Sequence, residues 1–315
     1  MVFAGWIMAF VVTATLGARE IVLGEHLPNY LTSTDVANVD LRLIASTFGN
    51  PNNYAAFLVT AFPFLVNLVL RSRARTIRSL GVSLAAMTCL LMLYTGSRIC
   101  IFALGLEILI LALLGGTRFR KGLFGFAIII SLFLLVAGTG LAGSIAPGLP
   151  TKLDSATPSR IFDEATGGGS TSSGERRVNL YLDGLWMISD SGGLGVGPGN
   201  FEAVMSTADV PYDTGGVLSP HNAYLEIASQ YGLLVFGAFL LWAGICFRIC
   251  WRAARHGGPR ARLWGMTAIA AFIGNCVSAL ASSSYLTGST NWVFMATLFL
   301  VTVTIEREAI IENGP

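Results

Sequence analysis

A single histidine and its neighbours are the first candidates for chemistry in this sequence. His221 is one of three histidines, Asn222 follows it directly, and Glu226 lies one helical turn further along the chain. An imidazole takes up and releases a proton near neutral pH, so His221 could serve as a general base. The simpler interpretation is that His221 anchors the start of a helix at a membrane surface. Its position in the sequence leaves both interpretations open.

Arginines beside apolar segments are the second candidates. A guanidinium group binds phosphate or pyrophosphate in a bidentate manner, so arginines at the mouth of a helix bundle suit recognition of a charged leaving group. The alternative is that each arginine extends toward lipid headgroups. Six arginines are expected on the outer side of the apolar segments: Arg19, Arg42, Arg98, Arg160, Arg176 and Arg177.

The sequence predicts no metal site and no cofactor. The five cysteines lie in or beside apolar segments and form no CxxC pair, so a zinc ion would lack ligands. The glycine-rich run Gly195–Gly199 has no GK[ST] and no preceding strand, which favours a turn over a phosphate-binding loop. A net charge of +2 indicates that the chain does not bind nucleic acid.

The composition is that of a membrane protein. Hydrophobic residues make up 53% of the chain and charged residues 12%, whereas a soluble domain carries about 25% charged residues. This excludes a soluble globular enzyme and a disordered chain. We predict an all-α polytopic membrane protein with about eight spans, at roughly 2–17, 53–70, 79–96, 99–115, 122–143, 223–247, 263–285 and 291–305.

The basic residues predict how these spans are oriented. If the spans alternate, three short arginine-rich connections and Arg307 fall on one side, which then holds 13 of the 20 basic residues. By the positive-inside rule that side is cytoplasmic and both termini lie inside. The outside receives residues 18–52 and 144–222. Residues 1–315 then form one membrane domain whose external loop, 144–222, carries candidate catalytic residues.

Two further features carry structural expectations. In the external loop an amphipathic helix is expected to lie on the outer leaflet, with one apolar face made of Val178, Leu182, Leu185 and Trp186. In the fourth span Glu107 lies at mid-depth, where an acid is costly. A polar contact between helices, to Asn67 or Asn275, is favoured over a functional role for Glu107, and Asn275 is expected to bond between helices.

Four short signatures follow one another along the chain. They are Arg42 with Gly49–Asn52 (GNPN), Thr95–Arg98 (TGSR), Arg176 or Arg177 with Trp186 and Gly195–Phe201 (GVGPGNF), and His221–Asn222 with GLL from Gly232. Together they resemble the O-antigen ligase and O-antigen polymerase superfamily of membrane glycosyltransferases over about residues 40–245. Members usually carry more spans before the first signature, so the chain is expected to be short at its N-terminus.

The resemblance implies a specific chemistry. The donor would be a glycan on undecaprenyl pyrophosphate, presented at the outer face of a bacterial cytoplasmic membrane. The acceptor would be a glycan or glycolipid, such as lipopolysaccharide core. His221 would activate the acceptor hydroxyl, and Arg98, Arg176 or Arg177, and Arg42 would bind the pyrophosphate. Asn222 and Glu226, beside His221, would be further contacts to the pyrophosphate or the glycan. No metal or cofactor is implied, because the leaving group is already activated.

Several alternatives remain open at this stage. The same signatures fit a ligase, a repeat-unit polymerase of O-antigen or exopolysaccharide, and an enzyme that glycosylates protein hydroxyls. A membrane transporter is a different class, although transporters often show inverted repeats and this sequence shows none. A purely structural role is a third class.

Overall fold

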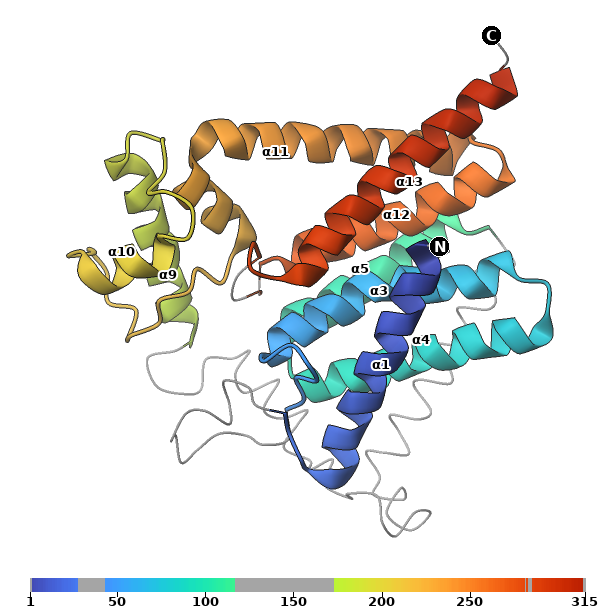
Figure 1. The fold of residues 1–315 in the computed structure, drawn as a ribbon, viewed down its shortest axis with the longest axis horizontal. Coiled ribbons are helices and arrows are strands. Elements are labelled where there is room, and N and C mark those ends of the chain that lie inside the picture. Colours follow the sequence, from blue (N-terminus) through green and yellow to red (C-terminus); the bar gives the residue numbers. More distant parts are fainter. Residues whose placement is uncertain (1, 28–42, 117–172, 281, 283–284, 314–315) are drawn as a thin grey trace.

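The computed structural model describes residues 2–27, 43–116, 173–280, 282 and 285–313, and these residues form α-helices and connecting segments (Figure 1). The expectation of an all-helical fold is confirmed for this part of the chain. The helices are α1 (Val2–Leu23), α3 (Pro51–Arg71), α4 (Arg75–Thr95), α5 (Arg98–Leu114), α9 (Ser173–Asp190), α10 (Phe201–Thr207), α11 (Ala223–His256), α12 (Pro259–Ser278) and α13 (Ser289–Asn313).

Four described helices, α1, α3, α4 and α11, are long and apolar enough to cross a membrane. The predicted spans 99–115, 263–285 and 291–305 correspond to α5, α12 and α13, although α12 ends at Ser278. The predicted span 122–143 lies outside the described residues. The total of about eight therefore stays a prediction.

Helix α3 lies at the centre of the bundle. Its residues from Tyr54 to Asn67 are all buried, because α1, α4, α5 and α12 pack around it. A helix that is apolar on every side is stable only when it is enclosed in this way. Trp6 of α1 stacks on Phe64 of α3 at 5.1 Å between ring centroids and donates a hydrogen bond to Thr297 of α13. These contacts join the first and last helices to the central one.

Polar side chains join the helices inside the bundle. The Asn275 amide nitrogen donates to Thr60 of α3 at 3.3 Å, and its oxygen accepts from the Tyr285 hydroxyl at 2.8 Å. The expectation that Asn275 bonds between helices is confirmed. Asn67 donates to Thr267 of α12 at 2.8 Å. Hydrogen bonds between polar side chains commonly stabilise the packing of membrane helices.

Glu107 of α5 does not make the contact expected from the sequence. Its side chain is fully buried, and neither carboxyl oxygen has a hydrogen-bond partner among the described residues. Asn67 and Asn275 bond elsewhere, so the expectation of a contact with either was wrong. The carboxyl group instead packs against Gly274 of α12, where an added Cβ would overlap it. The absence of a side chain at Gly274 is what allows α5 and α12 to pack here.

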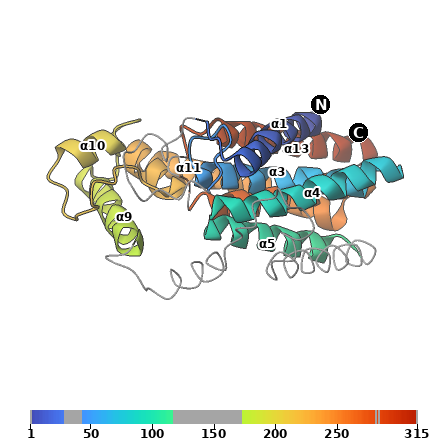
Figure 2. The same ribbon diagram turned by 90° about the horizontal axis from the view of Figure 1, so that it is seen from below.

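The two ends of the bundle differ in character. Helices α9 and α10 lie beyond one end, which we call the signature end because α3, α5, α11 and α13 all begin there (Figure 1). The arginine-rich turns 71–78 and 248–262 lie at the opposite end, and Figure 2 shows the same separation from below. The third basic connection, 118–121, lies outside the described residues, and the cytoplasmic orientation of the basic end stays a prediction.

Candidate functional site

The GNPN signature forms the start of α3 and the loop that leads into it. Asn50 caps the helix, since its side-chain oxygen accepts a hydrogen bond from the backbone N–H of Asn52 at 2.8 Å. Pro51 occupies the first helical position, where its missing N–H has no cost. The same loop bonds to the TGSR region, because Ile44 N–H donates to the Tyr94 carbonyl at 3.1 Å. The first two signatures are therefore neighbours in space.

Glu20, near the end of α1, holds this loop in place. Its Oε2 accepts hydrogen bonds from the backbone N–H groups of Ala45 and Ser46, both at 2.9 Å, and its side chain is buried. Its other oxygen lies 3.6 Å from Nδ1 of His26. Ser46 has a positive φ of 50°, a conformation that non-glycine residues rarely adopt without such support. Sequence reasoning missed Glu20; the available signal was one acidic residue at the end of an apolar segment.

Replacing Glu20 with alanine is expected to destabilise the protein and to weaken function at the signature end. The change leaves two buried backbone N–H groups without an acceptor, at a cost of about 1–3 kcal/mol. Thermal unfolding in detergent should show a lower midpoint. The matched control is Glu25→Ala, because Glu25 is exposed and forms a surface ion pair with Arg19. Equal midpoints for the two variants would contradict this role of Glu20.

The TGSR signature makes the tight turn between α4 and α5. Helix α4 ends at Thr95, Gly96 adopts a left-handed conformation with φ 66°, and Arg98 is the first residue of α5. A side chain at position 96 would also collide with Leu43, which an added Cβ would approach to 2.9 Å. The turn places Arg98 on the exposed surface of the signature end.

His221 and Asn222 lie immediately before α11. Asn222 caps that helix, accepting from the backbone N–H groups of Tyr224 and Leu225 at 3.0 and 3.3 Å. His221 is half-buried and has a positive φ of 48°. Its Nε2 lies 3.1 Å from the Ser219 hydroxyl oxygen. Strained backbone of this kind persists where the surroundings over-determine it and clusters at functional sites, which supports a functional reading of His221.

Glu226 faces the interior and ties α11 to the connection after α12. Its side chain is buried, and its Oε2 accepts from the backbone N–H of Tyr285 at 2.6 Å. A second bond runs from Ala223 N–H to the Ala279 carbonyl at 3.0 Å. Contact between Glu226 and substrate stays a prediction, and the geometry favours a positioning role. The connection after α12 is also joined to α3, because the Ser282 hydroxyl donates a hydrogen bond to the Asn53 side-chain oxygen at 3.2 Å.

The glycine-rich run of the third signature packs on a break in α11. Gly232, with φ 82° and ψ 169°, divides α11 into a short first segment and a long second one, and the bend is visible in Figure 1. The break frees the carbonyls of Ser229 and Gln230 from helical bonding, and N–H groups of the run take them instead. We call residues 193–199 together with 229–233 the glycine clasp. Its backbone hydrogen bonds are Val196 N to Ser229 O (2.8 Å), Gly197 N to Gln230 O (3.0 Å) and Leu233 N to Gly193 O (2.9 Å).

The interpretation of Gly195–Gly199 as a turn is confirmed, and the clasp explains its composition. An added Cβ at Gly195 would lie 2.6 Å from the backbone nitrogen of Gly232, so both backbones need glycine to approach. The Gln230 side chain also accepts a hydrogen bond from Gly199 N–H. Gln230 is a second residue that sequence reasoning missed, because its partner lies 31 positions earlier.

Helix α9 runs beside the first segment of α11 in the same direction, since both segments end at the clasp. The clasp lies at the C-terminal end of α9, and Gly184 packs directly on Leu225. Arg176 and Arg177 in the second turn of α9 therefore lie toward the end from which α11 starts. The Arg176 side chain lies over Gly215, where an added Cβ would be 3.1 Å from its Nε. Arg177 is half-buried, and Arg42 lies outside the described residues.

The amphipathic helix is present as α9, and its packed face only partly overlaps the predicted one. Leu180 and Met187 pack against α10 and its neighbours with Trp186 beside them, whereas Val178 and Leu185 remain more than half exposed. The predicted face is therefore only partly covered by protein. Its contact with the outer leaflet stays a prediction.

Asp183 holds the segment after α10 against α9. Its Oδ1 accepts from the backbone N–H of Tyr212 at 3.1 Å, and its Oδ2 is buried with no hydrogen-bond partner among the described residues. Burial raises the pKa of this carboxyl, and the bond from Tyr212 lowers it by less. The folded protein therefore binds this proton more tightly than the unfolded chain does.

A pH dependence of stability follows from the raised pKa of Asp183. Stability is expected to fall as the pH rises from the ordinary aspartate value of 3.8 through the raised pKa, because ionisation is disfavoured only in the folded state. Asp183→Asn keeps an acceptor for Tyr212 and should flatten this slope in thermal unfolding across the acidic range. Asp209→Asn, at an exposed position, is the control and should keep the slope. An unchanged slope in Asp183→Asn would show that Asp183 is not its source.

A family model described as O-Antigen ligase matches residues 82–240, which is half of the chain and includes the last three signatures. The teichuronic acid biosynthesis protein TuaE of Bacillus subtilis (strain 168) is 24% identical, and the alignment covers 98% of this chain and 62% of TuaE. The chain thus spans less than two thirds of that relative's length.

Proposed function

Because the chain belongs to the O-antigen ligase family, a family of glycosyl-transfer enzymes in polysaccharide biosynthesis, we propose that it transfers a glycan from undecaprenyl pyrophosphate to an acceptor hydroxyl. The reaction takes place at the outer face of the bacterial cytoplasmic membrane. The acceptor is a glycan or glycolipid, and the described helices are those of a multi-pass membrane protein.

One observation carries this proposal: hydrogen bonds connect the four signatures into one network at the signature end. Ile44, in the loop between Arg42 and GNPN, bonds to Tyr94, which precedes TGSR. Asn53, which follows GNPN, bonds to Ser282. Glu226 then joins the Ser282–Tyr285 segment to the helix that His221 precedes. The glycine clasp adds the third signature to the same helix. Residues spread over the chain thus converge where a membrane-anchored donor and its acceptor could meet.

His221 acts as the general base in the proposed reaction. Its imidazole takes the proton from the acceptor hydroxyl as that oxygen attacks the anomeric carbon. The bond between the anomeric carbon and the pyrophosphate oxygen breaks, and undecaprenyl pyrophosphate leaves with the electron pair. Attack from the face opposite the leaving group inverts the anomeric configuration. Asn222 positions His221 by capping α11.

The arginines and the helix ends stabilise the charge of the leaving pyrophosphate. Arg98, Arg176 and Arg177 are the described cations assigned to this role, with Arg42 as a further candidate. The N-termini of α5 and α11 lie at the same end, and each adds a partial positive charge. This charge would be present before the reaction, so little reorganisation would be needed as the bond breaks. The reaction needs neither a metal ion nor a cofactor, because the donor is already activated.

The test is glycan transfer by the purified protein in liposomes that contain a lipid-linked glycan donor. Transfer that persists in the presence of a chelator is the expected result. Solute uptake by these liposomes without any glycan transfer would instead indicate a transporter. In the host, deletion of the gene should leave full-length polymer on the lipid carrier if the protein is a ligase.

The similarity to TuaE favours repeat-unit polymerisation as a second candidate. That protein is named for the biosynthesis of teichuronic acid and not for the ligation of O-antigen. In a polymerase the acceptor would be another lipid-linked repeat unit, with His221 in the same role. Gene deletion would then reduce the surface glycan to single repeat units, which separates the two candidates.

A further inference from the structure

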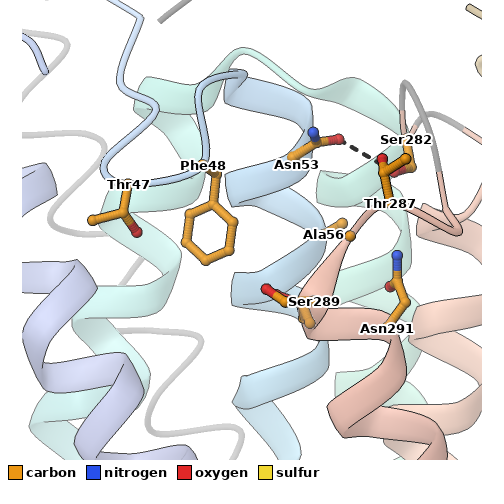
Figure 3. A pocket seen from close by; sticks show the side chains of 10 residues that line it. Thr47, Phe48, Asn53, Ala56, Ser282, Thr287, Ser289 and Asn291 are labelled. Atoms are coloured by element: carbon orange, nitrogen blue, oxygen red, sulfur yellow. Dashed lines mark hydrogen bonds between the residues drawn. The ribbon is translucent and has the colours of Figure 1, made fainter. Parts of the chain in front are cut away.

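A polar pocket of about 290 Å³ opens beside the GNPN loop at the signature end (Figure 3). One wall is the loop residues Thr47 and Phe48, and α3 contributes Asn53 and Ala56. The opposite wall is the segment 287–291, which includes the first turn of α13.

The described lining is neutral and rich in hydroxyl and amide groups. Its polar side chains are threonine, serine and asparagine, and no arginine, lysine, histidine, aspartate or glutamate is among them. A pyrophosphate would require cations, so this pocket does not suit the leaving group. Hydroxyls and amides both donate and accept hydrogen bonds, which matches the alternating donors and acceptors of sugar hydroxyls.

One aromatic ring gives the pocket an apolar face. Phe48 lines the wall opposite α13 and stacks on Tyr54 and Phe57 of α3, with ring centroids 5.5 and 5.0 Å apart. The stack holds the ring in one orientation, so its face is available to the C–H groups of a pyranose. Small-molecule sites commonly combine such an apolar surface with a few fixed polar groups.

The polar lining is also held in position before any ligand arrives. Asn53 accepts a hydrogen bond from Ser282, and the Asn291 amide donates to the Tyr285 carbonyl at 2.8 Å. A preformed lining loses little conformational entropy on binding. The volume is at the lower limit of the range of about 300–1,000 Å³ typical of ligand pockets, so it holds one ring and not a chain.

We propose that this pocket is a neutral sugar subsite that binds one hexopyranose or N-acetylhexosamine ring of the glycan being joined. The inference rests on the proposed glycosyl transfer and assigns the substrate class to residues outside the four signatures. Arg98, Arg176 and Arg177 would hold the pyrophosphate, whereas the pocket would hold a sugar ring and set its approach to His221.

Binding of simple glycosides to the purified full chain tests this assignment. The probes are the methyl glycosides of glucose and of N-acetylglucosamine, detected by saturation-transfer NMR, with inorganic pyrophosphate as a competitor. Ser289→Trp and Thr47→Trp fill the pocket from opposite walls, and both positions are exposed, so the fold should accept the added bulk. Ser206→Trp, on an exposed face of α10, is the matched control.

We expect glycoside binding in the wild type and in Ser206→Trp, and affinity at least about tenfold weaker in both pocket variants, a difference of roughly 1.4 kcal/mol. Unchanged binding in the pocket variants, no glycoside binding in the wild type, or displacement of the glycoside by pyrophosphate would each overturn the assignment.

A transfer assay separates this inference from the proposed function. Ser289→Trp should raise the KM for donor or acceptor by about tenfold with little change in kcat, as expected for loss of a binding contact. If the wild type transfers glycan and Ser289→Trp has unchanged KM values for both substrates, the subsite is wrong and the function stands. If the pocket binds glycosides but the wild type transfers none, the function is wrong and the pocket remains a sugar site of another kind.

Discussion

Replacing His221 with asparagine is expected to reduce glycan transfer by roughly a hundredfold or more, which is the contribution typical of a positioned general base. Asparagine is the informative substitution because it tolerates the positive φ of 48° found at this position. The backbone should therefore keep its conformation while the imidazole is lost. Alanine would strain the backbone as well as remove the imidazole, so the loss of activity would combine the two effects.

The measurement is kcat for transfer from a lipid-linked donor, together with the thermal unfolding midpoint of each variant. His256→Asn is the matched control, since His256 ends α11 at the opposite, basic end of the bundle. It should transfer at the wild-type rate. Wild-type kcat in His221→Asn would remove His221 from the chemistry and leave it as a helix anchor, the alternative that the sequence left open.

Replacing Gly232 with alanine is expected to disrupt the glycine clasp and to abolish most transfer. Its φ of 82° and ψ of 169° belong to a region that is essentially restricted to glycine. An added Cβ would also lie 2.5 Å from the Leu194 carbonyl oxygen and 2.7 Å from that of Gly193. These groups are backbone atoms that cannot rotate away. Conformational strain alone costs about 1–3 kcal/mol, and the steric overlap adds to it.

The control for this change lies on the same helix. Gly237 has no atom within 4 Å of an added Cβ and no unusual φ, so Gly237→Ala should be neutral or slightly stabilising. Limited proteolysis should cut near residues 191–199 much faster in Gly232→Ala than in Gly237→Ala or the wild type. Equal cleavage in both variants would mean that the clasp does not depend on Gly232.

The local features of the fold could be predicted from neighbouring residues. Apolar blocks located the described spans to within a few residues at most ends, since burial in lipid depends on composition over one segment. Helix starts such as Asn50–Pro51 and Asn222 carry their own caps in the sequence. The family was also predictable, because its signatures are short and contiguous.

The candidate site could be predicted only in part. His221 and Arg98 were identified by residue type beside an apolar segment, but the residues that position this end were not. Glu20 bonds to a loop 25 and 26 positions further along the chain, and Glu226 bonds to Tyr285, 59 positions away. No periodicity links such pairs. The sugar pocket was likewise invisible, because its walls come from segments more than 200 residues apart.

The sequence by itself determined that this chain is a helical membrane protein of the O-antigen ligase family, because hydropathy, caps and short signatures act over one or two helical turns. Only the tertiary structure decided which residues of α9 pack on protein and why positions 195 and 232 are both glycine. It also decided that the Glu107 carboxyl group packs against Gly274 and not against Asn67 or Asn275. These outcomes depend on which backbones approach each other. That approach follows from the packing of whole helices, which no single stretch of residues encodes.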